Sequence, residues 1–259
     1  MSVRVCVLGS GSKGNSTWVA TESTRLLVDA GFSRRETFAR LTARGERAET
    51  CNAILISHEH SDHVGGLAKL ARDIGCPVYI TGGTRDAMEW DRKIEACELI
   101  EAGRAFMIGD IKVSPFSIPH DAAEPVAFTV EAQGIKIAVV TDLGYIPEHV
   151  KQHVRACNCL VFESNHDVEM LKVGPYPWHV KQRVMGRQGH LSNSTTAEFL
   201  CGDYDATSQV LVLAHLSETN NHPELARLSA LEALERRSAS GAPELHLATQ
   251  TTPTKMFVW

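Results

Sequence analysis

The first half of the chain alternates between short apolar runs that predict β-strands and stretches that predict helices. We expect strands at Val3–Leu8, Trp18–Ala20, Arg25–Val28, Ala53–Ile56, Val78–Ile80, Ile111–Ile118, Ala127–Glu131 and Ile135–Val140. Helices are expected between them, at about Arg34–Ala43, Gly65–Ile74, Thr84–Glu89 and Pro147–Val154.

The second half repeats this order of strands and helices. Strands are predicted at Leu160–Glu163, Val210–Ala214 and Leu245–Ala248, with helices near Thr195–Leu200 and Pro223–Arg237. Two such groups of elements favour two sheets with helices on their outer faces. The prediction is an α+β fold, an αββα four-layer sandwich. Because no linker rich in proline, glycine or serine divides the chain, we expect one domain over residues 1–259.

Composition and charge narrow the class of protein. The formal net charge is −5, so any affinity for nucleic acid must come from a local patch. The first residues reach glycine and serine before a signal peptide can develop, and no later run approaches a membrane span. The seven cysteines are scattered and odd in number. We therefore expect reduced thiols and a cytoplasmic protein with no membrane partner.

One motif carries candidate chemistry. The segment from His58 to His63 reads H-x-H-x-D-H and directly follows an apolar strand. His58 and His60 leave the strand end on the same side and can hold one ion, whereas Asp62 and His63 on the next turn can hold another. Histidine and carboxylate ligands suit zinc, manganese or iron, and the motif contains no cysteine of the kind found in closed structural zinc sites. The alternative is a solvated histidine-rich loop.

This motif resembles the signature of the metallo-β-lactamase superfamily. Four further residues of that signature occur in the expected order along the chain, each at the carboxyl end of an apolar strand: Asp29, His120, Asp142 and His215. The resemblance implies two divalent metal ions, zinc or manganese. It assigns His58, His60 and His120 to one ion and Asp62, His63 and His215 to the other, with Asp142 bridging both and Asp29 fixing a ligand histidine.

Two further segments resemble the nuclease branch of the superfamily, as in ribonuclease Z. They are residues 163–167 and 189–197, which carry Glu163 and His190. By that resemblance, His190 donates a proton to the leaving oxygen and Glu163 supports it. The alternative for His190 is a helix-capping or core histidine. His166 is left open, because the neighbouring Asp167 would give it a simple surface partner.

Over nearly its full length the chain resembles the YycJ/WalJ group of this superfamily, which are bacterial exonucleases or nuclease-like hydrolases. The resemblance implies a dinuclear-metal phosphodiester hydrolase, a DNA exonuclease of the 5′–3′ type, in which a metal-bridged hydroxide attacks phosphorus. Asp62, Asp142, Glu163 and His190 would be the catalytic residues. The alternatives are a phosphodiesterase acting on small cyclic or nucleotide-like esters and a non-catalytic, metal-containing nucleic-acid-binding module. The oligomeric state is left open.

A basic segment offers a place for nucleic acid. Between Glu169 and Glu198 the chain has no acidic residue, but it has basic residues with aromatic ones among them. Such a segment can hold a sugar-phosphate backbone and stack a base, and a solvated loop with buried aromatics is the alternative. The candidate substrate contacts are Ser12, Asn15, His166, Trp178, Lys181, Arg183, Asn193 and Asn220.

Residues 9–14 read G-x-G-x-x-G after a strand, which imitates a dinucleotide-binding fingerprint. That fingerprint requires a helix to follow, but residues 15–21 are β-like and rich in turn formers. Only ten residues separate Gly14 from the next strand, too few for a crossover helix. We therefore expect a tight turn here.

Overall fold

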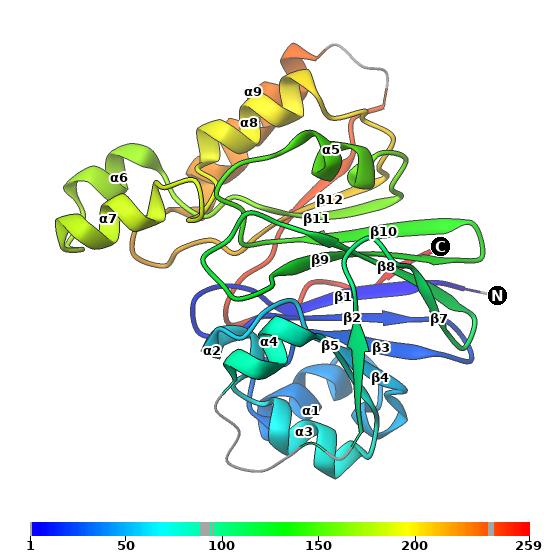
Figure 1. The fold of residues 1–259 in the computed structure, drawn as a ribbon. Coiled ribbons are helices and arrows are strands. Elements are labelled where there is room, and N and C mark those ends of the chain that lie inside the picture. Colours follow the sequence, from blue (N-terminus) through cyan, green and yellow to red (C-terminus); the bar gives the residue numbers. More distant parts are fainter. Residues whose placement is uncertain (1, 89–93, 95, 238–240) are drawn as a thin grey trace. The chain divides into compact units, whose positions relative to one another are not determined.

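The computed structural model describes residues 2–88, 94, 96–237 and 241–259, and the chain divides into two compact units (Figure 1). The first comprises Met1–Ser117, Ala122–Ile135 and Thr249–Trp259. The second comprises Ile118–Asp121 and Lys136–Ala248. That the chain forms a single domain stays a prediction.

The first unit contains a seven-stranded sheet in the order β14-β1-β2-β3-β4-β5-β6. β1, β2 and β3 pair antiparallel, whereas β3 to β6 run parallel, with helices in the connections. The strands are β1 Arg4–Gly9, β2 Ser16–Ala20, β3 Arg25–Val28, β4 Ala53–Leu55, β5 Val78–Thr81, β6 Cys97–Ile100 and β14 Phe257–Val258. The helices are α1 Arg34–Thr42, the 3-10 helix η1 Ala48–Thr50, α2 Ser61–Val64, α3 Leu67–Ile74 and α4 Gly82–Ala87.

Helices α1 and α3 cover one face of this sheet. Leu41 of α1 and Leu70 of α3 share a buried cluster with Trp18, Leu27 and Ile54 of the strands. These side chains are 0–1% exposed. Burying each leucine contributes about 1.5–3 kcal/mol, so the apolar face of each helix fixes it on the sheet.

Three further antiparallel strands belong to the first unit: β7 Phe106–Ile108, β8 Ile111–Ser117 and β9 Val126–Ala132. Phe106 stacks on Tyr79 of β5, with ring centroids 5.1 Å apart, and the Thr21 hydroxyl donates to Asp110 Oδ1 at 2.9 Å. Strands β6 and β7 were not predicted. Both are short and expose an apolar side chain, Leu99 or Met107, so neither shows a buried alternating face.

The second unit is built on parallel strands β10 Ile135–Val140, β11 Cys159–Glu163, β12 Val210–Ala214 and β13 Glu244–Leu247. β11 and β12 are buried throughout, as expected for parallel strands covered on both faces. The helices are α5 Glu148–Val154, α6 Val168–Val173, α7 Trp178–Val184, α8 Asn193–Gly202 and α9 Pro223–Arg236. α8 runs alongside α9 (Figure 1), and Phe199 of α8 stacks on Phe162 of β11 at 4.8 Å.

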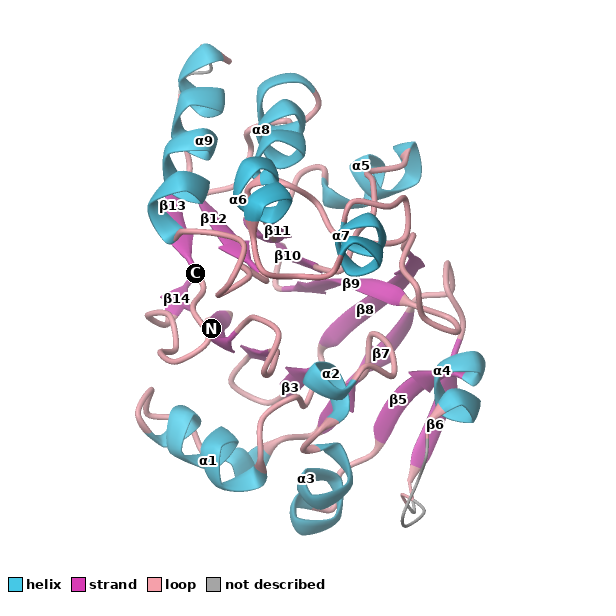
Figure 2. Cartoon of the chain, turned by 90° about the vertical axis from the view of Figure 1, so that its left-hand side faces the viewer, coloured by secondary structure: helices cyan, strands magenta, loops and turns pink. Residues whose placement is uncertain are grey.

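The basic segment contains two helices that were not predicted, so it is not the solvated loop that was the alternative interpretation. Helices α6 and α7 lie next to each other (Figure 2), and the Lys181 ammonium of α7 donates to the Lys172 carbonyl oxygen of α6 at 2.7 Å. The Asp167 carboxylate caps α6 by accepting from the Met170 N–H at 2.9 Å. Both helices are short, which is why hydrophobic periodicity did not reveal them.

Other predictions about the fold can be compared directly with the structure. Residues 9–14 form a turn between β1 and its antiparallel neighbour β2, so the rejection of a dinucleotide fingerprint is confirmed. All seven cysteines are free thiols, as predicted. Among the described residues, no helix is both long and apolar enough to cross a membrane.

Candidate metal and catalytic site

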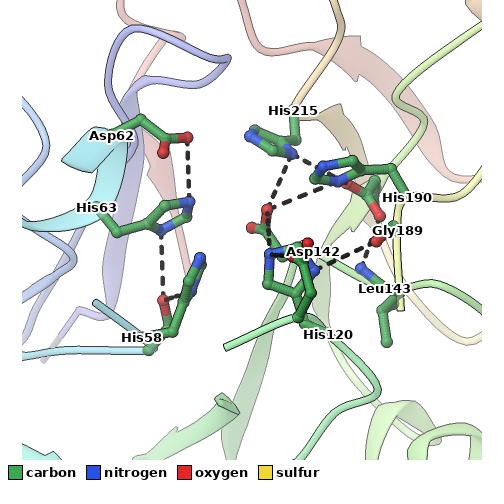
Figure 3. Close-up of polar contacts among 12 residues, drawn as sticks. His58, Asp62, His63, His120, Asp142, Leu143, Gly189, His190 and His215 are labelled. Carbon is green, nitrogen blue, oxygen red and sulfur yellow. Dashed lines mark hydrogen bonds and ion pairs between the residues drawn. The ribbon is translucent and has the colours of Figure 1, made fainter. Parts of the chain in front are cut away.

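In the first unit, the H-x-H-x-D-H segment follows β4 and turns into α2. The His58 ring lies 4.7 Å from the His60 ring and 4.1 Å from the His63 ring, measured between centroids. His58 and His63 are fully buried, and His60 is the extended residue before α2. The Asp62 Oδ2 atom lies 3.4 Å from His63 Nε2 (Figure 3). The motif therefore brings its three imidazoles and its carboxylate together, as its spacing predicts.

Asp29 orients two histidines of this motif. Its Oδ2 atom accepts from His63 Nδ1 at 2.9 Å and from the Ser57 hydroxyl at 3.0 Å. The Ser57 hydroxyl is in turn 2.9 Å from His58 Nδ1, which donates to it. With both Nδ1 atoms donating, the Nε2 atom of each ring carries the lone pair that a metal needs.

A neighbouring loop supports the motif from the side. The Asn15 amide nitrogen donates to Asp62 Oδ2 at 3.0 Å, and its backbone N–H donates to the Asp62 carbonyl oxygen at 2.7 Å. Gly31 packs so closely that a Cβ atom there would lie 1.8 Å from the Asp62 carbonyl oxygen. Only glycine fits at this position, because any side chain would push the motif out of place.

In the second unit, three side chains point toward Asp142 (Figure 3). Asp142 Oδ1 lies 3.3 Å from His215 Nδ1, 3.7 Å from His120 Nε2 and 3.7 Å from His190 Nδ1. His120, Asp142 and His215 are each 2–3% exposed. Burial lowers the pKa of His120, although the nearby Asp142 charge opposes this. A neutral imidazole is the form in which histidine binds a metal.

Glu163, at the end of β11, is fully buried and joins the other residues of this cluster. Its Oε1 atom accepts from the Nδ1 atoms of His190 and His215, both at 2.9 Å. Its Oε2 atom accepts from the backbone N–H groups of Leu143 at 2.8 Å and Leu191 at 3.1 Å. Burial by itself would raise the pKa of Glu163, but His190 and His215 outweigh it and hold the pKa at about 2. Glu163 is therefore a buried carboxylate that orients two histidines.

The contacts of Glu163 also set the chemistry of His190. Because His190 Nδ1 donates to the carboxylate, Nε2 is the nitrogen left to exchange a proton with a substrate. The side chain of His190 is 21% exposed, in contrast to the buried histidines around it. A partly exposed imidazole with a carboxylate behind it is the arrangement expected of a general acid. Neither capping nor core packing accounts for this geometry.

The donor chemistry of both clusters fits divalent metal ions. A histidine that binds metal through one ring nitrogen usually donates from the other to a carboxylate or carbonyl oxygen. His63 donates to Asp29, and His215 donates to Glu163. The third example is His120, whose Nδ1 atom is 3.3 Å from the Gly189 carbonyl oxygen. Within the second unit, donor atoms of Asp142, Glu163, His190 and His215 lie within 4.8 Å of one another.

Three of these residues have left-handed backbone conformations that the sequence did not indicate. The φ angles are 62° at Asp29, 65° at Asp142 and 57° at His215, each just beyond a buried strand. Such angles are uncommon outside glycine and cluster at functional sites. The only sequence signal was the position of each residue at a strand end.

The structure separates the predicted substrate contacts into two groups. Ser12, Trp178 and Arg183 are exposed, and contact with substrate stays a prediction for them. Asn15, His166, Lys181, Asn193 and Asn220 are buried, at 1–8% exposure. Lys181 is thus not part of a basic surface, because its ammonium is bonded to the Lys172 carbonyl oxygen. The Asn193 side-chain oxygen Oδ1 accepts from the Ser164 hydroxyl at 2.7 Å, within the interior of the unit.

His166 is also not the surface residue that its neighbour Asp167 suggested. It is 2% exposed, and among the described residues its Nδ1 atom has no hydrogen-bond partner. Burial lowers the pKa of His166 to about 4, so the ring is neutral at pH 7. The surface interpretation failed because the Asp167 carboxylate is used to cap α6.

The fold and its two clusters of histidine and carboxylate define a metal-dependent hydrolase of the metallo-β-lactamase fold. A sequence profile of the beta-lactamase superfamily domain matches residues 24–215, and the chain belongs to this family. Within it, the chain groups with the exodeoxyribonucleases YycJ and WalJ. It is 38% identical to exodeoxyribonuclease YycJ of Bacillus anthracis over 99% of both chains. It is 36% identical to exodeoxyribonuclease WalJ of Streptococcus pneumoniae over 88% of this chain and 87% of that one.

Solved structures show the same fold. The metallo-β-lactamase fold protein YhfI of Bacillus subtilis superposes with a TM-score of 0.74 over 100% of this chain and 99% of that one, at 17% identity. The short form of human tRNase Z superposes with a TM-score of 0.64 over 97% and 98%, at 18% identity. These matches and the family profile confirm the predicted fold class.

Proposed function

We propose that this chain is an exonuclease that hydrolyses phosphodiester bonds in DNA with two divalent metal ions, zinc or manganese. The observation that carries the proposal is the hydrogen bond between buried Glu163 and partly exposed His190, beside Asp142. Phosphodiester cleavage expels a poor leaving group, so a positioned proton donor has a direct use. The full-length similarity to proteins named exodeoxyribonucleases supports DNA as the polymer.

In this proposal the two clusters supply ligands to one dinuclear centre. His58, His60 and His120 would hold one ion and Asp62, His63 and His215 the other, and Asp142 would serve both. Membership of the family and the orientation of the ring nitrogens support this assignment. When bound, divalent ions supply an activated water nucleophile and offset charge on the phosphate oxygens.

The residues of the chain then orient the reacting groups and move the proton. Glu163 holds His190 by Nδ1, so the proton on Nε2 is directed away from the carboxylate and can pass to the departing oxygen. The same carboxylate holds His215 in the orientation that leaves its Nε2 for a metal. Removing His190 should lower the cleavage rate by roughly 10²–10⁴-fold and leave the metal content unchanged.

Cleavage of end-labelled DNA and RNA, single- and double-stranded, tests the proposal. The protein is reconstituted with zinc or manganese separately, and Asp142→Ala is the inactive control. Loss of label from one end of DNA, absent in the control, is the expected result, and it also gives the polarity and the metal. Failure to cleave any polymer, with turnover of bis-p-nitrophenyl phosphate retained, would contradict the exonuclease and favour a small phosphodiester as the substrate.

A further inference from the structure

A pocket of about 620 Å³ lies in the second unit, beside the histidine and carboxylate cluster. Its volume falls within the roughly 300–1,000 Å³ typical of small-molecule sites. The lining residues are Pro119, Asp121, Tyr145, Arg183, Gly186, Arg187 and Gln188. Of these, Arg183 was among the candidate substrate contacts, and Arg187 belongs to the basic segment.

The pocket is built by the loops that carry His120, Asp142 and His190. Backbone hydrogen bonds tie these loops together: the Asp121 N–H donates to the Gln188 carbonyl oxygen at 3.1 Å, and the Gly144 N–H donates to the Pro119 carbonyl oxygen at 2.9 Å. Tyr145 comes three residues after Asp142, and Arg187 three residues before His190. Asp121 Oδ1, in the pocket lining, lies 3.5 Å from His120 Nε2, and the His120 ring is 5.2 Å from the His190 ring between centroids. The pocket therefore adjoins the residues around the proposed proton donor.

The loops approach one another at Gly144. A Cβ atom at this position would lie 2.1 Å from the Arg187 carbonyl oxygen and 2.5 Å from the Gln188 nitrogen. Both are backbone atoms and cannot rotate away. The backbone that carries Tyr145 is therefore held beside the backbone that carries Arg187.

Arg187 and Tyr145 form a cation–π pair within the pocket. The Arg187 guanidinium carbon lies 4.2 Å from the centre of the Tyr145 ring. Among the described residues, no carboxylate pairs with Arg187. Arg183 is different, because its Nε atom is hydrogen-bonded to Asp121 Oδ2. The two guanidinium groups and the one carboxylate leave the pocket with one net positive charge, in a chain whose net charge is −5.

We propose that this pocket binds a deoxynucleoside monophosphate, the terminal unit that an exonuclease releases. The phosphate lies between Arg183 and Arg187, and the base stacks against the Tyr145–Arg187 pair. An arginine whose guanidinium lies over a ring and that has no carboxylate partner can still donate hydrogen bonds to a phosphate. The pocket is thus the subsite for the terminal nucleotide, an inference that rests on the proposed function.

Titration calorimetry on metal-loaded protein tests this without requiring DNA cleavage. The probes are deoxyadenosine 5′- and 3′-monophosphate, deoxyadenosine and inorganic phosphate. We expect one of the two nucleotides to bind more tightly than either fragment. Arg187→Ala and Tyr145→Ala should each weaken that binding by at least about fivefold, the lower end for loss of a stacked base. Tyr145→Phe, which keeps the ring, should restore it.

Arg155→Ala is the matched control, because it removes an exposed arginine of the same unit outside the pocket and should leave the affinity unchanged. Thermal midpoint and metal content show whether each variant is folded. Equal nucleotide affinity in the native protein and Arg187→Ala, or a nucleotide affinity no greater than that of phosphate, would overturn the proposal. If the nucleotide binds as described but DNA is not cleaved, the nucleotide-binding pocket is supported and the proposed exonuclease activity is contradicted.

Discussion

Replacement of Glu163 by glutamine keeps the size of the side chain and removes its charge. In the native protein, one carboxylate oxygen of Glu163 accepts hydrogen bonds from His190 and His215, and the other accepts from two backbone N–H groups. In Glu163→Gln the amide oxygen can still accept from the backbone, but the amide nitrogen then faces both imidazoles as a donor. Each Nδ1 atom must then become an acceptor, which moves the ring proton to Nε2.

Two separate losses follow from this change of tautomer. At His215 the proton occupies the nitrogen proposed to bind metal, so metal affinity should fall by about 10–100-fold. At His190 the imidazolium loses its carboxylate partner, so proton donation should weaken by roughly 10²–10⁴-fold. Hydrogen bonds to a charged group contribute about 1.5–3 kcal/mol each, so stability should fall as well.

Two substrates separate these effects in Glu163→Gln at saturating metal. DNA has a poor leaving group and needs a proton donor, whereas bis-p-nitrophenyl phosphate releases a stable phenolate and does not. We expect the rate on DNA to fall far more than the rate on the small ester. Chelator competition measures metal affinity, and Glu148→Gln, an exposed residue on α5, is the matched control. Equal losses on the two substrates, or an unchanged metal affinity, would refute the reasoning.

Three further predictions concern other positions. Asp29→Asn should lower metal affinity by about 10–100-fold, measured by chelator competition, because a ligand histidine loses its carboxylate partner. Gly144→Ala should lower the free energy of unfolding by about 1–3 kcal/mol in denaturant titrations, because its Cβ would overlap backbone atoms; an unchanged midpoint would contradict the close approach. Burial lowers the pKa of His166 to about 4 in the folded protein, whereas its ordinary value is 6.5. Between pH 4 and 6.5 the unfolded chain therefore binds more protons at this residue than the folded one. The free energy of unfolding should fall as the pH drops from 6.5 to 4. His166→Asn should remove up to about 3 kcal/mol of this pH dependence, which parallel denaturant titrations of both proteins would show.

The sequence predicted the elements whose signals are local. The apolar strands and the longer helices were found within one or two residues of their observed bounds, as for β3 at Arg25–Val28 and α9 at Pro223–Arg236. The cluster formed by the H-x-H-x-D-H motif could also be predicted from the sequence, because its residues lie within six consecutive positions. Short elements such as α6 and α7 were missed, since one or two turns give no usable period.

Some features of the site depend on contacts between distant segments. Family resemblance predicted from the sequence that Glu163 supports His190. Only the folded chain shows that the Glu163 carboxylate also accepts a hydrogen bond from His215, 52 residues away. The pocket lined by Tyr145 and Arg187 likewise depends on contact between distant segments, because two loops meet closely at Gly144. A sequence pattern contains information about residues that are close along the chain. It therefore determined which candidate ligand residues are present and that they lie at strand ends. Partners, burial and pocket shape are set by packing across the fold, and only the tertiary structure decided them.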